Sequence, residues 1–197
     1  MGAPLTATAP IIQVRAARRA EARTIARLTD IAGEGLASHL WSHMAGPNES
    51  ALSVGTARAA RCDGAFSWRN ARTSTWHGAA VGIVIDYDLD DVEPPGADVP
   101  PLLRPLCALE AEVAGTRYIN VLAVCAQARR RGVASALIAD VAARTDRDMT
   151  LIMASGNDAA RAFYVLQGFE EVTRRPMGPR GPKGLTGAWC LMRRPGR

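Results

Sequence analysis

Three arginines precede a glycine in the segment 129–134, and this cluster is the strongest chemical signal in the chain. Its residues read Arg-Arg-Arg-Gly-Val-Ala, between a predicted apolar strand at 118–124 and a predicted helix that starts at Gly132. The first N–H groups of a helix have no partner within it, and the positive end of the helix dipole attracts anions. An arginine-rich turn alone is often just solvated surface, but this strand-turn-helix context favours a phosphate or pyrophosphate site.

A second segment of interest lies at 157–169, where Asn157, Tyr164 and the pair Gly168-Phe169 follow one another. Asn157 is a good N-cap for a helix over 158–167, and Gly168 is a good residue to end it. Taken alone, Asn157 is only a helix cap. Tyr164 alone is a core aromatic residue whose hydroxyl finds a partner.

Together the two segments resemble the GCN5-related N-acetyltransferase (GNAT) superfamily, whose members bind acetyl-coenzyme A. The pattern Arg129-x-x-Gly132-x-Ala134 is similar to the motif after the family's fourth strand, and 157–169 is similar to its later Asn…Tyr…Gly-Phe segment. The resemblance covers 118–173 most specifically. It implies an α+β fold in three α/β/α layers, with a mixed, mostly antiparallel central sheet whose fourth and fifth strands splay apart.

The resemblance also implies a donor site. Gly132 and Ala134 keep the turn free of side chains, so that backbone N–H groups reach the pyrophosphate. The end of the strand at 118–124 would pair with the pantetheine arm, and Tyr164 would protonate the departing thiolate. The residues expected to bind acetyl-CoA are Leu122, Ala123, Val124, Arg129, Arg130, Arg131, Gly132, Val133, Ala134, Ser135, Asn157 and Tyr164.

The acceptor side carries weaker signals. An attacking amine must be neutral, so a general base is expected, yet the strand at 118–124 has no carboxylate or histidine. Glu110 is the preferred candidate for the catalytic base over Glu112, Glu34 and His39, although a water chain or an already neutral amine would remove the need for a base. Glu34 is expected to hold a cationic amine and Trp41 to form an apolar wall, while both also suit packing between the early helices and the sheet.

These implications predict an acetyl-CoA-dependent N-acetyltransferase that acts on an amine by direct attack in a ternary complex. The alternative is an acyl-CoA-binding sensor of the same fold with weak or no activity. Related proteins often dimerise, so a homodimer is compatible with the resemblance. The sequence does not identify the acceptor.

The elements that must position these residues follow from periodicity and turn signals. Asn48 is the predicted cap of the third helix, and His77-Gly78 is the predicted hairpin turn. The predicted order is a strand at 11–14, helices at 18–32, 36–44 and 50–61, a hairpin of strands 66–76 and 79–86, a strand at 118–124, a helix from 132, a strand at 149–154, a helix at 158–167, and strands at 169–173 and 188–192.

One domain accounts for this order. We expect a leader at 1–10, a single N-acetyltransferase domain at 11–193 and a basic tail at 194–197. Within the domain, proline and acidic residues predict a loop at 88–107, and glycine, proline and arginine predict another at 174–187.

Composition narrows the classes of partner. The net charge of +5 lies mostly in separate arginine clusters without interleaved aromatic residues, a pattern that does not favour nucleic-acid binding. Four cysteines, at 62, 107, 125 and 190, lie far apart and lack metal-ligand spacing, so no metal is expected. No apolar segment is long enough to cross a bilayer or to serve as a signal peptide, so a cytoplasmic protein without a membrane partner is expected.

Overall fold

The computed structural model describes residues 12–90, 92, 96, 99–178, 182 and 185–197. In this part of the chain seven strands form one sheet in the order β1-β2-β3-β4-β5-β7-β6. All neighbouring strands are antiparallel except β4 and β5, which are parallel. The strands are β1 (Gln13–Ala16), β2 (Ala71–Trp76), β3 (Ala79–Leu89), β4 (Thr116–Val124), β5 (Met149–Ala154), β6 (Glu170–Pro176) and β7 (Ala188–Arg194).

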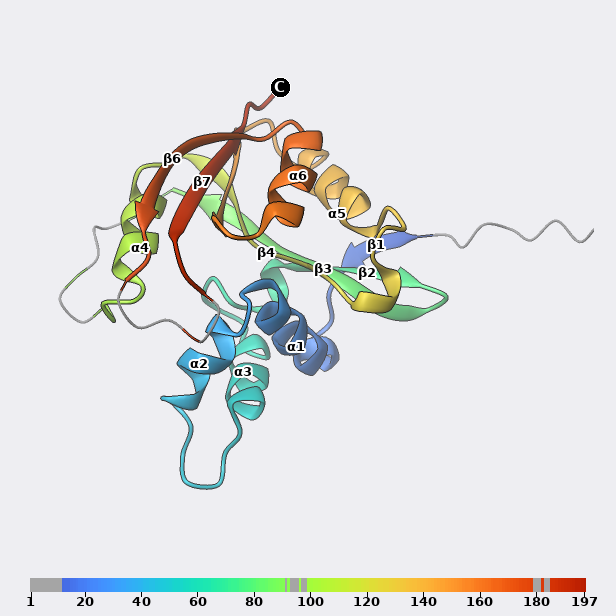
Figure 1. The fold of residues 1–197 in the computed structure, drawn as a ribbon. Coiled ribbons are helices and arrows are strands. Elements are labelled where there is room, and N and C mark those ends of the chain that lie inside the picture. The colour runs from blue at the N-terminus through green and yellow to red at the C-terminus, as the bar shows by residue number, and fades with distance from the viewer. Residues whose placement is uncertain (1–11, 91, 93–95, 97–98, 179–181, 183–184) are drawn as a thin grey trace, which may run out of the picture.

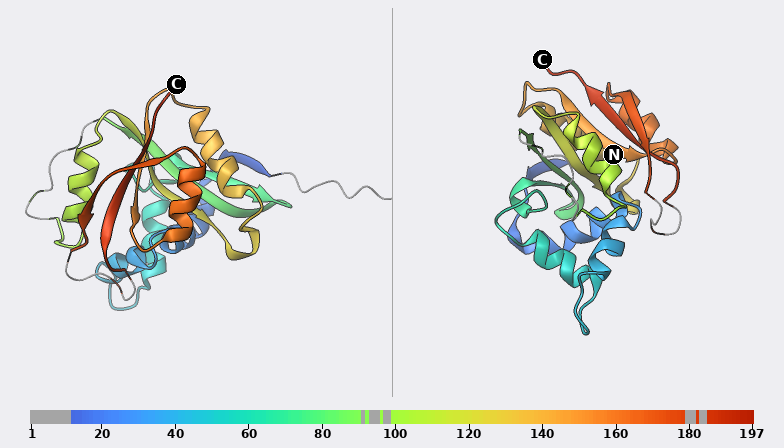
Figure 2. Two further views of the ribbon diagram at one scale, coloured as in Figure 1. Left: turned by 45° about the horizontal axis from the view of Figure 1, so that its top comes forward. Right: turned by 90° about the vertical axis from the view of Figure 1, so that its left-hand side faces the viewer.

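Helices cover both faces of the sheet, which gives the three expected layers (Figure 1). Two helices lie on one face, and the early helices gather on the other, as both views in Figure 2 also show. The first group is α5 (Val133–Ala142) and α6 (Asp158–Leu166), and the second is α1 (Ala22–Ala32), α2 (Leu36–Ser42), α3 (Ala51–Ala59) and α4 (Arg104–Ala111). The predicted α+β class with a mixed, mostly antiparallel sheet is therefore confirmed.

Strand β3 shows why both faces are covered. Val84 packs against the residues of α5, whereas Ile83 and Ile85 pack against α1, as the period of two in a strand requires. Gly82 lets α5 approach closely, since a Cβ there would lie 2.8 Å from Cγ1 of Val133. The start of α5 is thus fixed against the middle of the sheet.

The separation of β4 from β5 is the main irregularity of the sheet. Their parallel register holds only three residue pairs and ends at Ile119 and Leu151. Just beyond this point, β4 has a bulge: Ile119 pairs with Asp86 and Val121 pairs with Ile85, so Asn120 is an extra residue. The expected splaying of the fourth and fifth strands is confirmed, and the bulge turns Asn120 out of a largely buried strand.

Several predicted boundaries change in the structure. The hairpin turn at His77-Gly78 is confirmed, with φ of 49° and 79°. Helix α3 is capped by Ser50 rather than Asn48, because the Ser50 hydroxyl accepts a hydrogen bond from the N–H of Ser53 at 3.1 Å. Asn48 lies too early to reach the first turn.

Both predicted loops are shorter than expected. Strand β3 continues to Leu89 and α4 begins at Arg104, which leaves less of 88–107 for a loop. Strand β6 continues to Pro176 because it stays paired with β7, and Arg194 is the last residue of β7 rather than part of the tail. The leader predicted at 1–10 lies outside the described residues.

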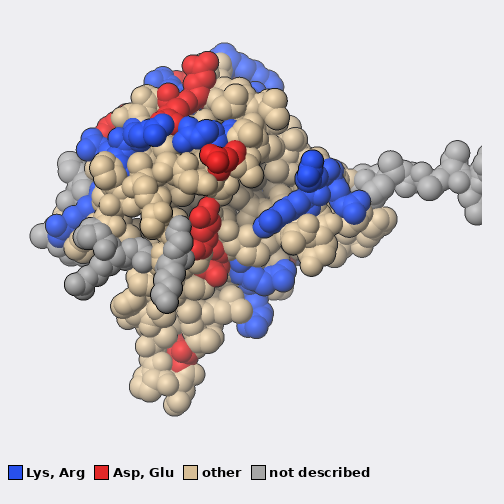
Figure 3. Space-filling view, viewed as in Figure 1, with Lys and Arg blue, Asp and Glu red and all other residues tan. Residues whose placement is uncertain are grey.

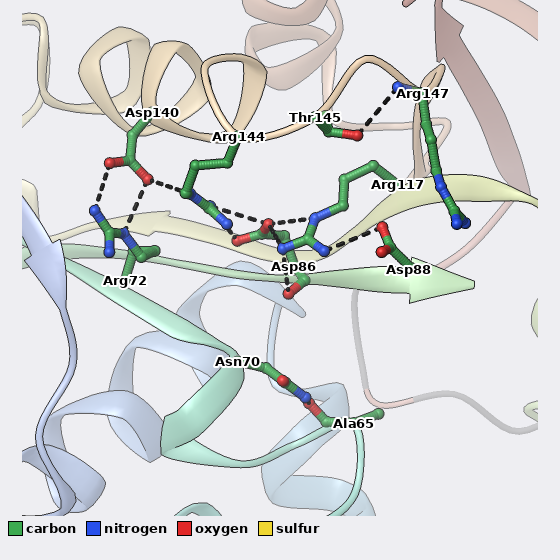
Figure 4. A network of polar contacts seen from close by, with 10 residues as sticks. All are labelled: Ala65, Asn70, Arg72, Asp86, Asp88, Arg117, Asp140, Arg144, Thr145 and Arg147. Atoms are coloured by element: carbon green, nitrogen blue, oxygen red, sulfur yellow. Dashed lines mark hydrogen bonds and ion pairs between the residues drawn. The ribbon is translucent and has the colours of Figure 1, made fainter. Parts of the chain in front are cut away.

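A network of ion pairs ties the sheet to α5 (Figure 4). The carboxylate of Asp86, whose side chain is 1% exposed, accepts hydrogen bonds from Arg117 at 2.7 Å and from Arg144 at 2.9 Å. Asp140 on α5 binds Arg144 and also Arg72 on β2. Charges from three strands and one helix therefore neutralise one another beneath α5.

None of the helices in the described ranges is long and apolar enough to cross a membrane.

Candidate functional site

A cleft of about 550 Å³ opens where β4 and β5 separate. Strands β4 and β5 form its floor, and the α1–α2 connection and α6 form parts of its walls. Many of the residues singled out in the sequence line it, from both sides of the sheet. They are Glu34, Leu122, Ala123, Val124, Arg129, Ala134, Asn157 and Tyr164.

The N-terminus of α5 opens at one end of this cleft. Gly132 is its N-cap with φ of 82°, and no side chain in the described part of the chain caps it. The first helical bond runs from the N–H of Ala136 to the carbonyl of Gly132, so the N–H groups of 133–135 precede it. Uncapped amides at the positive end of a ten-residue helix are chemically suited to an anion.

The three arginines of this turn point to different surroundings. Arg129 lines the cleft, and its Nε donates to the carbonyl of Val124 at 3.3 Å. Arg131 stacks over the ring of Trp76 at 4.5 Å instead. Arg130 is exposed and adopts φ of 59°, a left-handed conformation that the tight turn imposes. Of the three, Arg129 is therefore the one placed beside the cleft.

Three residues predicted to bind the donor, Gly132, Val133 and Ser135, do not line the cleft but lie at the start of α5. Val133 is 2% exposed and packs in the core, so only its backbone is available to a ligand. Ser135 accepts a long hydrogen bond from Gln167 at 3.5 Å. A Cβ at Gly132 would have room, since it would lie 3.8 Å from the side chain of Ile12, but the positive φ there favours glycine.

Tyr164 lies on α6 and lines the cleft. It is 9% exposed and packs edge-on against Phe163 and Phe169. Burial raises the pKa of its hydroxyl, so the group keeps its proton in neutral solution. This hydroxyl makes no hydrogen bond to any other described residue, which leaves its proton available to a ligand.

Asn157 and Glu34 meet across the mouth of the cleft. The side-chain oxygen of Asn157 caps α6 by accepting from the N–H of Ala160 at 3.0 Å. Its amide nitrogen donates to the carboxylate of Glu34 at 2.7 Å. Glu34 and Gly35 both have positive φ, at 51° and 88°, and this sharp connection between α1 and α2 directs Glu34 to the site.

Glu110 stands behind the cleft rather than in its wall. It lies on α4, and its carboxylate interacts with the hydroxyl of Tyr118, a β4 residue that does line the cleft. Burial raises the pKa of Glu110, and the interaction with Tyr118 opposes that rise. The Tyr118 hydroxyl therefore offers a path for a proton between the cleft and the carboxylate of Glu110.

Trp41 lies outside the cleft. Its ring is 5% exposed, packs near Phe66, and covers Gly55, where a Cβ would lie 2.4 Å away. Trp41 lines a second pocket of about 840 Å³ between α2 and the start of α4. The apolar wall of the first cleft is made by Leu36, Leu40, Leu106, Leu185 and Trp189, and Leu40 lines both pockets.

Two residues that line the cleft, Tyr118 and Asn120, were not predicted as site residues from the sequence. Tyr118 gives no signal, because an aromatic residue at the start of a buried strand usually serves packing. Asn120 does give one: it is the polar residue within an otherwise apolar run from Tyr118 to Val124. In the structure it is exposed and lines the cleft.

Comparison with known proteins identifies the fold. Residues 108–178 match a family model described as an acetyltransferase (GNAT) domain. An N-acetyltransferase from Staphylococcus aureus Mu50 is 15% identical and has a TM-score of 0.67, with 92% of this chain and 99% of that chain covered.

Two further solved structures share the fold. The ribosomal-protein-S18-alanine N-acetyltransferase from Escherichia coli is 15% identical with a TM-score of 0.56, and 94% of each chain is covered. Arabidopsis thaliana Naa50, solved in complex with a bisubstrate analogue, is 14% identical with a TM-score of 0.54, with 93% of this chain and 97% of that chain covered. None of the curated protein sequences compared with this chain matches it significantly.

The comparisons confirm the resemblance to the GNAT superfamily carried by 129–134 and 157–169. At these identities the solved structures establish the fold. Within the described residues, no group of three or more histidine, cysteine, aspartate or glutamate side chains is arranged to hold a metal ion.

Proposed function

We propose that this chain, a GNAT-fold protein whose residues 108–178 match the acetyltransferase family model, transfers the acetyl group of acetyl-CoA to an amine. The observation that carries the proposal is the uncapped N-terminus of α5 at one end of a cleft formed where β4 leaves β5. An anion site joined to an open strand edge suits a ligand with a pyrophosphate and an amide-bearing arm.

The donor would lie along the cleft with its pyrophosphate at the turn. The N–H groups of 133–135 and the guanidinium of Arg129 supply hydrogen-bond donors and positive charge there. The backbone of 122–124, beyond the last pair with β5, is available to the amides of the pantetheine arm. Asn157 can offer its remaining amide hydrogen to the same arm.

The chemical step is an attack of the amine nitrogen on the thioester carbonyl carbon. A C–N bond forms, the carbonyl oxygen carries the negative charge of the tetrahedral intermediate, and backbone N–H groups of β4 stabilise it. When the C–S bond breaks, the sulfur keeps the electron pair. The hydroxyl of Tyr164, buried and protonated, gives the thiolate its proton.

The attacking amine must also lose a proton. We assign this step to Glu110, which would receive the proton through the hydroxyl of Tyr118. Glu34 is the carboxylate that would receive the acceptor before reaction, and Trp41 would contact the far part of an acceptor that extends into the second pocket. Because Glu110 does not line the cleft itself, a sensor that binds acyl-CoA without transfer is the second candidate.

Formation of free CoA, measured by liquid chromatography, tests the proposal without interference from the protein's own thiols. The purified chain is given acetyl-CoA with amines, peptides or polyamines. Release of CoA that depends on the acceptor, and that falls in the Tyr164→Phe variant, supports transfer. Tight binding of acetyl-CoA with no acceptor-dependent release supports the sensor.

A further inference from the structure

The cleft has two chemically different ends. Arg129 and the start of α5 lie at the end assigned to the donor. Residues of the opposite helical layer, from α2 and α4, of the segment before β7 and of β7 itself also line the cleft, away from that turn. The apolar side chains there are Leu36, Leu40, Leu106, Leu185 and Trp189.

Charge at this second end is sparse. Among the described residues that line the cleft, Glu34 is the single carboxylate and Arg129 the single cation. Glu34 is exposed at the mouth, and its carboxylate is held by the amide of Asn157. Figure 3 shows this side of the molecule as largely uncharged, with acidic and basic side chains in small groups on it.

A polycation such as a polyamine or an aminoglycoside needs several carboxylates, because each ammonium group that leaves water requires a partner. One carboxylate beside five apolar side chains satisfies one ammonium group and covers an apolar body. The lining of the cleft therefore favours amines with one charge over polycations, a choice that the sequence alone does not make.

We propose that the acceptor is a singly charged primary amine with an apolar body. Its ammonium group is received by Glu34, and its body lies on the apolar wall of the cleft, which includes Leu36 and Leu40. This inference rests on the proposed acetyl transfer and names its substrate class. The second pocket extends the same surface, since it shares Leu40 and adds Trp41, Met44 and Leu102. An acceptor with a long apolar body has room to continue into it.

The test uses calorimetric binding to the full chain saturated with CoA. The probes are phenethylamine, its uncharged analogue 2-phenylethanol, and spermidine. Phenethylamine is expected to bind at least about tenfold more tightly than either comparison compound, the effect of one well-placed ionic contact. In Glu34→Gln its affinity falls to that of 2-phenylethanol. The matched control is Glu170→Gln, at an exposed residue of β6 outside the cleft, which leaves the affinity unchanged.

Three results overturn the inference: equal or tighter binding of spermidine, equal binding of phenethylamine and 2-phenylethanol, or no binding of phenethylamine at millimolar concentration. Release of CoA is measured in parallel and reports on transfer separately. Binding of phenethylamine without CoA release for any amine contradicts acetyl transfer, and it then shows only which class of amine the cleft binds. Faster release with spermidine than with phenethylamine supports transfer and overturns the class.

Discussion

The amide of Asn157 donates to the carboxylate of Glu34 at 2.7 Å, although the two residues lie 123 positions apart in the chain. Asn157 begins α6, on the face of the sheet assigned to the donor, and Glu34 ends the connection from α1 on the opposite face. One hydrogen bond thus joins a residue expected to bind acetyl-CoA to one expected to bind the amine. A substitution at Asn157 should therefore weaken the binding of both acetyl-CoA and the amine.

The Asn157→Asp variant separates the two tasks of this side chain. Aspartate caps a helix as well as asparagine does, so the free energy of unfolding should change by less than about 1 kcal/mol. It cannot donate to Glu34, and its charge repels that carboxylate. We expect the KM for both the amine and acetyl-CoA to rise by about tenfold, the effect of a lost charge-assisted hydrogen bond. Asn157→Ala, which also loses the cap, should cost about 1 kcal/mol in denaturant unfolding. Wild-type KM values in Asn157→Asp would contradict the link.

Replacing Tyr164 by phenylalanine removes the proposed acid while it keeps the ring contacts with Phe163 and Phe169. We expect kcat to fall by about 10²- to 10⁴-fold, the usual range for a general acid. The affinity for CoA, measured by calorimetry, should stay within about twofold because the hydroxyl is one small part of the donor contact. An unchanged kcat with a good acceptor would show that another group protonates the thiolate.

Glu110→Gln tests the base and has a second readout in stability. A base acts when ionised, so wild-type kcat/KM should rise with pH through the raised pKa of Glu110, and the variant should lose that rise. A carboxyl pKa raised by folding stabilises the protein fully below the unfolded pKa, and this contribution is lost as pH rises through the folded pKa. Glutamine cannot ionise, so the variant should resist urea at least as well as wild type at neutral pH. A pH profile that keeps its rise would assign the base elsewhere.

The arginine turn offers a matched pair of variants. Arg129 lines the cleft, whereas Arg131 stacks on Trp76. Arg129→Gln should raise the KM for acetyl-CoA by about tenfold, and added salt should shrink the difference from wild type because salt screens the exposed charge. Arg131→Gln should change that KM much less. Equal effects of the two substitutions would mean that the turn attracts the donor only through its overall charge.

Asp86→Asn tests the network beneath α5. The change leaves Arg117 and Arg144 without their shared buried anion, and breaking such a pair costs about 3 kcal/mol or more. Asp90→Asn is the control, because its pair with Arg147 is exposed and is worth less than about 1 kcal/mol. Denaturant unfolding measures both, and the affinity for CoA should be unchanged in each. A loss below about 1 kcal/mol for Asp86→Asn would show that the arginines find other partners.

Local signals predicted much of the fold, including the elements that surround the proposed donor site. The His77-Gly78 turn, the apolar run of β4 and the Asn157 cap each depend on neighbours in sequence. Helix α4 was missed because Pro105 lies in a proline-rich stretch, although proline is well suited to the first turn of a helix. Residues that depend on distant partners were harder to predict. The bulge at Asn120 arises from the pairing of β4 with β3, and no local pattern specifies it.

The acceptor half depends still more on contacts between distant segments. The link from Glu110 to Tyr118 requires α4 to lie beside β4, and the placement of Trp41 over Gly55 requires α2 to pack on α3. Residue types alone suggested Trp41 for the cleft wall, whereas the structure places leucines and Trp189 there. Sequence periodicity says which face of a helix is apolar, but not which neighbour covers it.

The short ladder between β4 and β5 makes this the most weakly paired place in the sheet. Strands β1–β4 and β5–β7 form two continuous sections that share only three residue pairs. A donor arm bound in the gap would act as an additional strand that joins the two sections along their whole length. Slower hydrogen exchange at 121–124 and at the end of β5 would then accompany every binding event. Under the proposed function, the acyl donor would complete the sheet while it is bound, and each release of product would open the gap between β4 and β5 again.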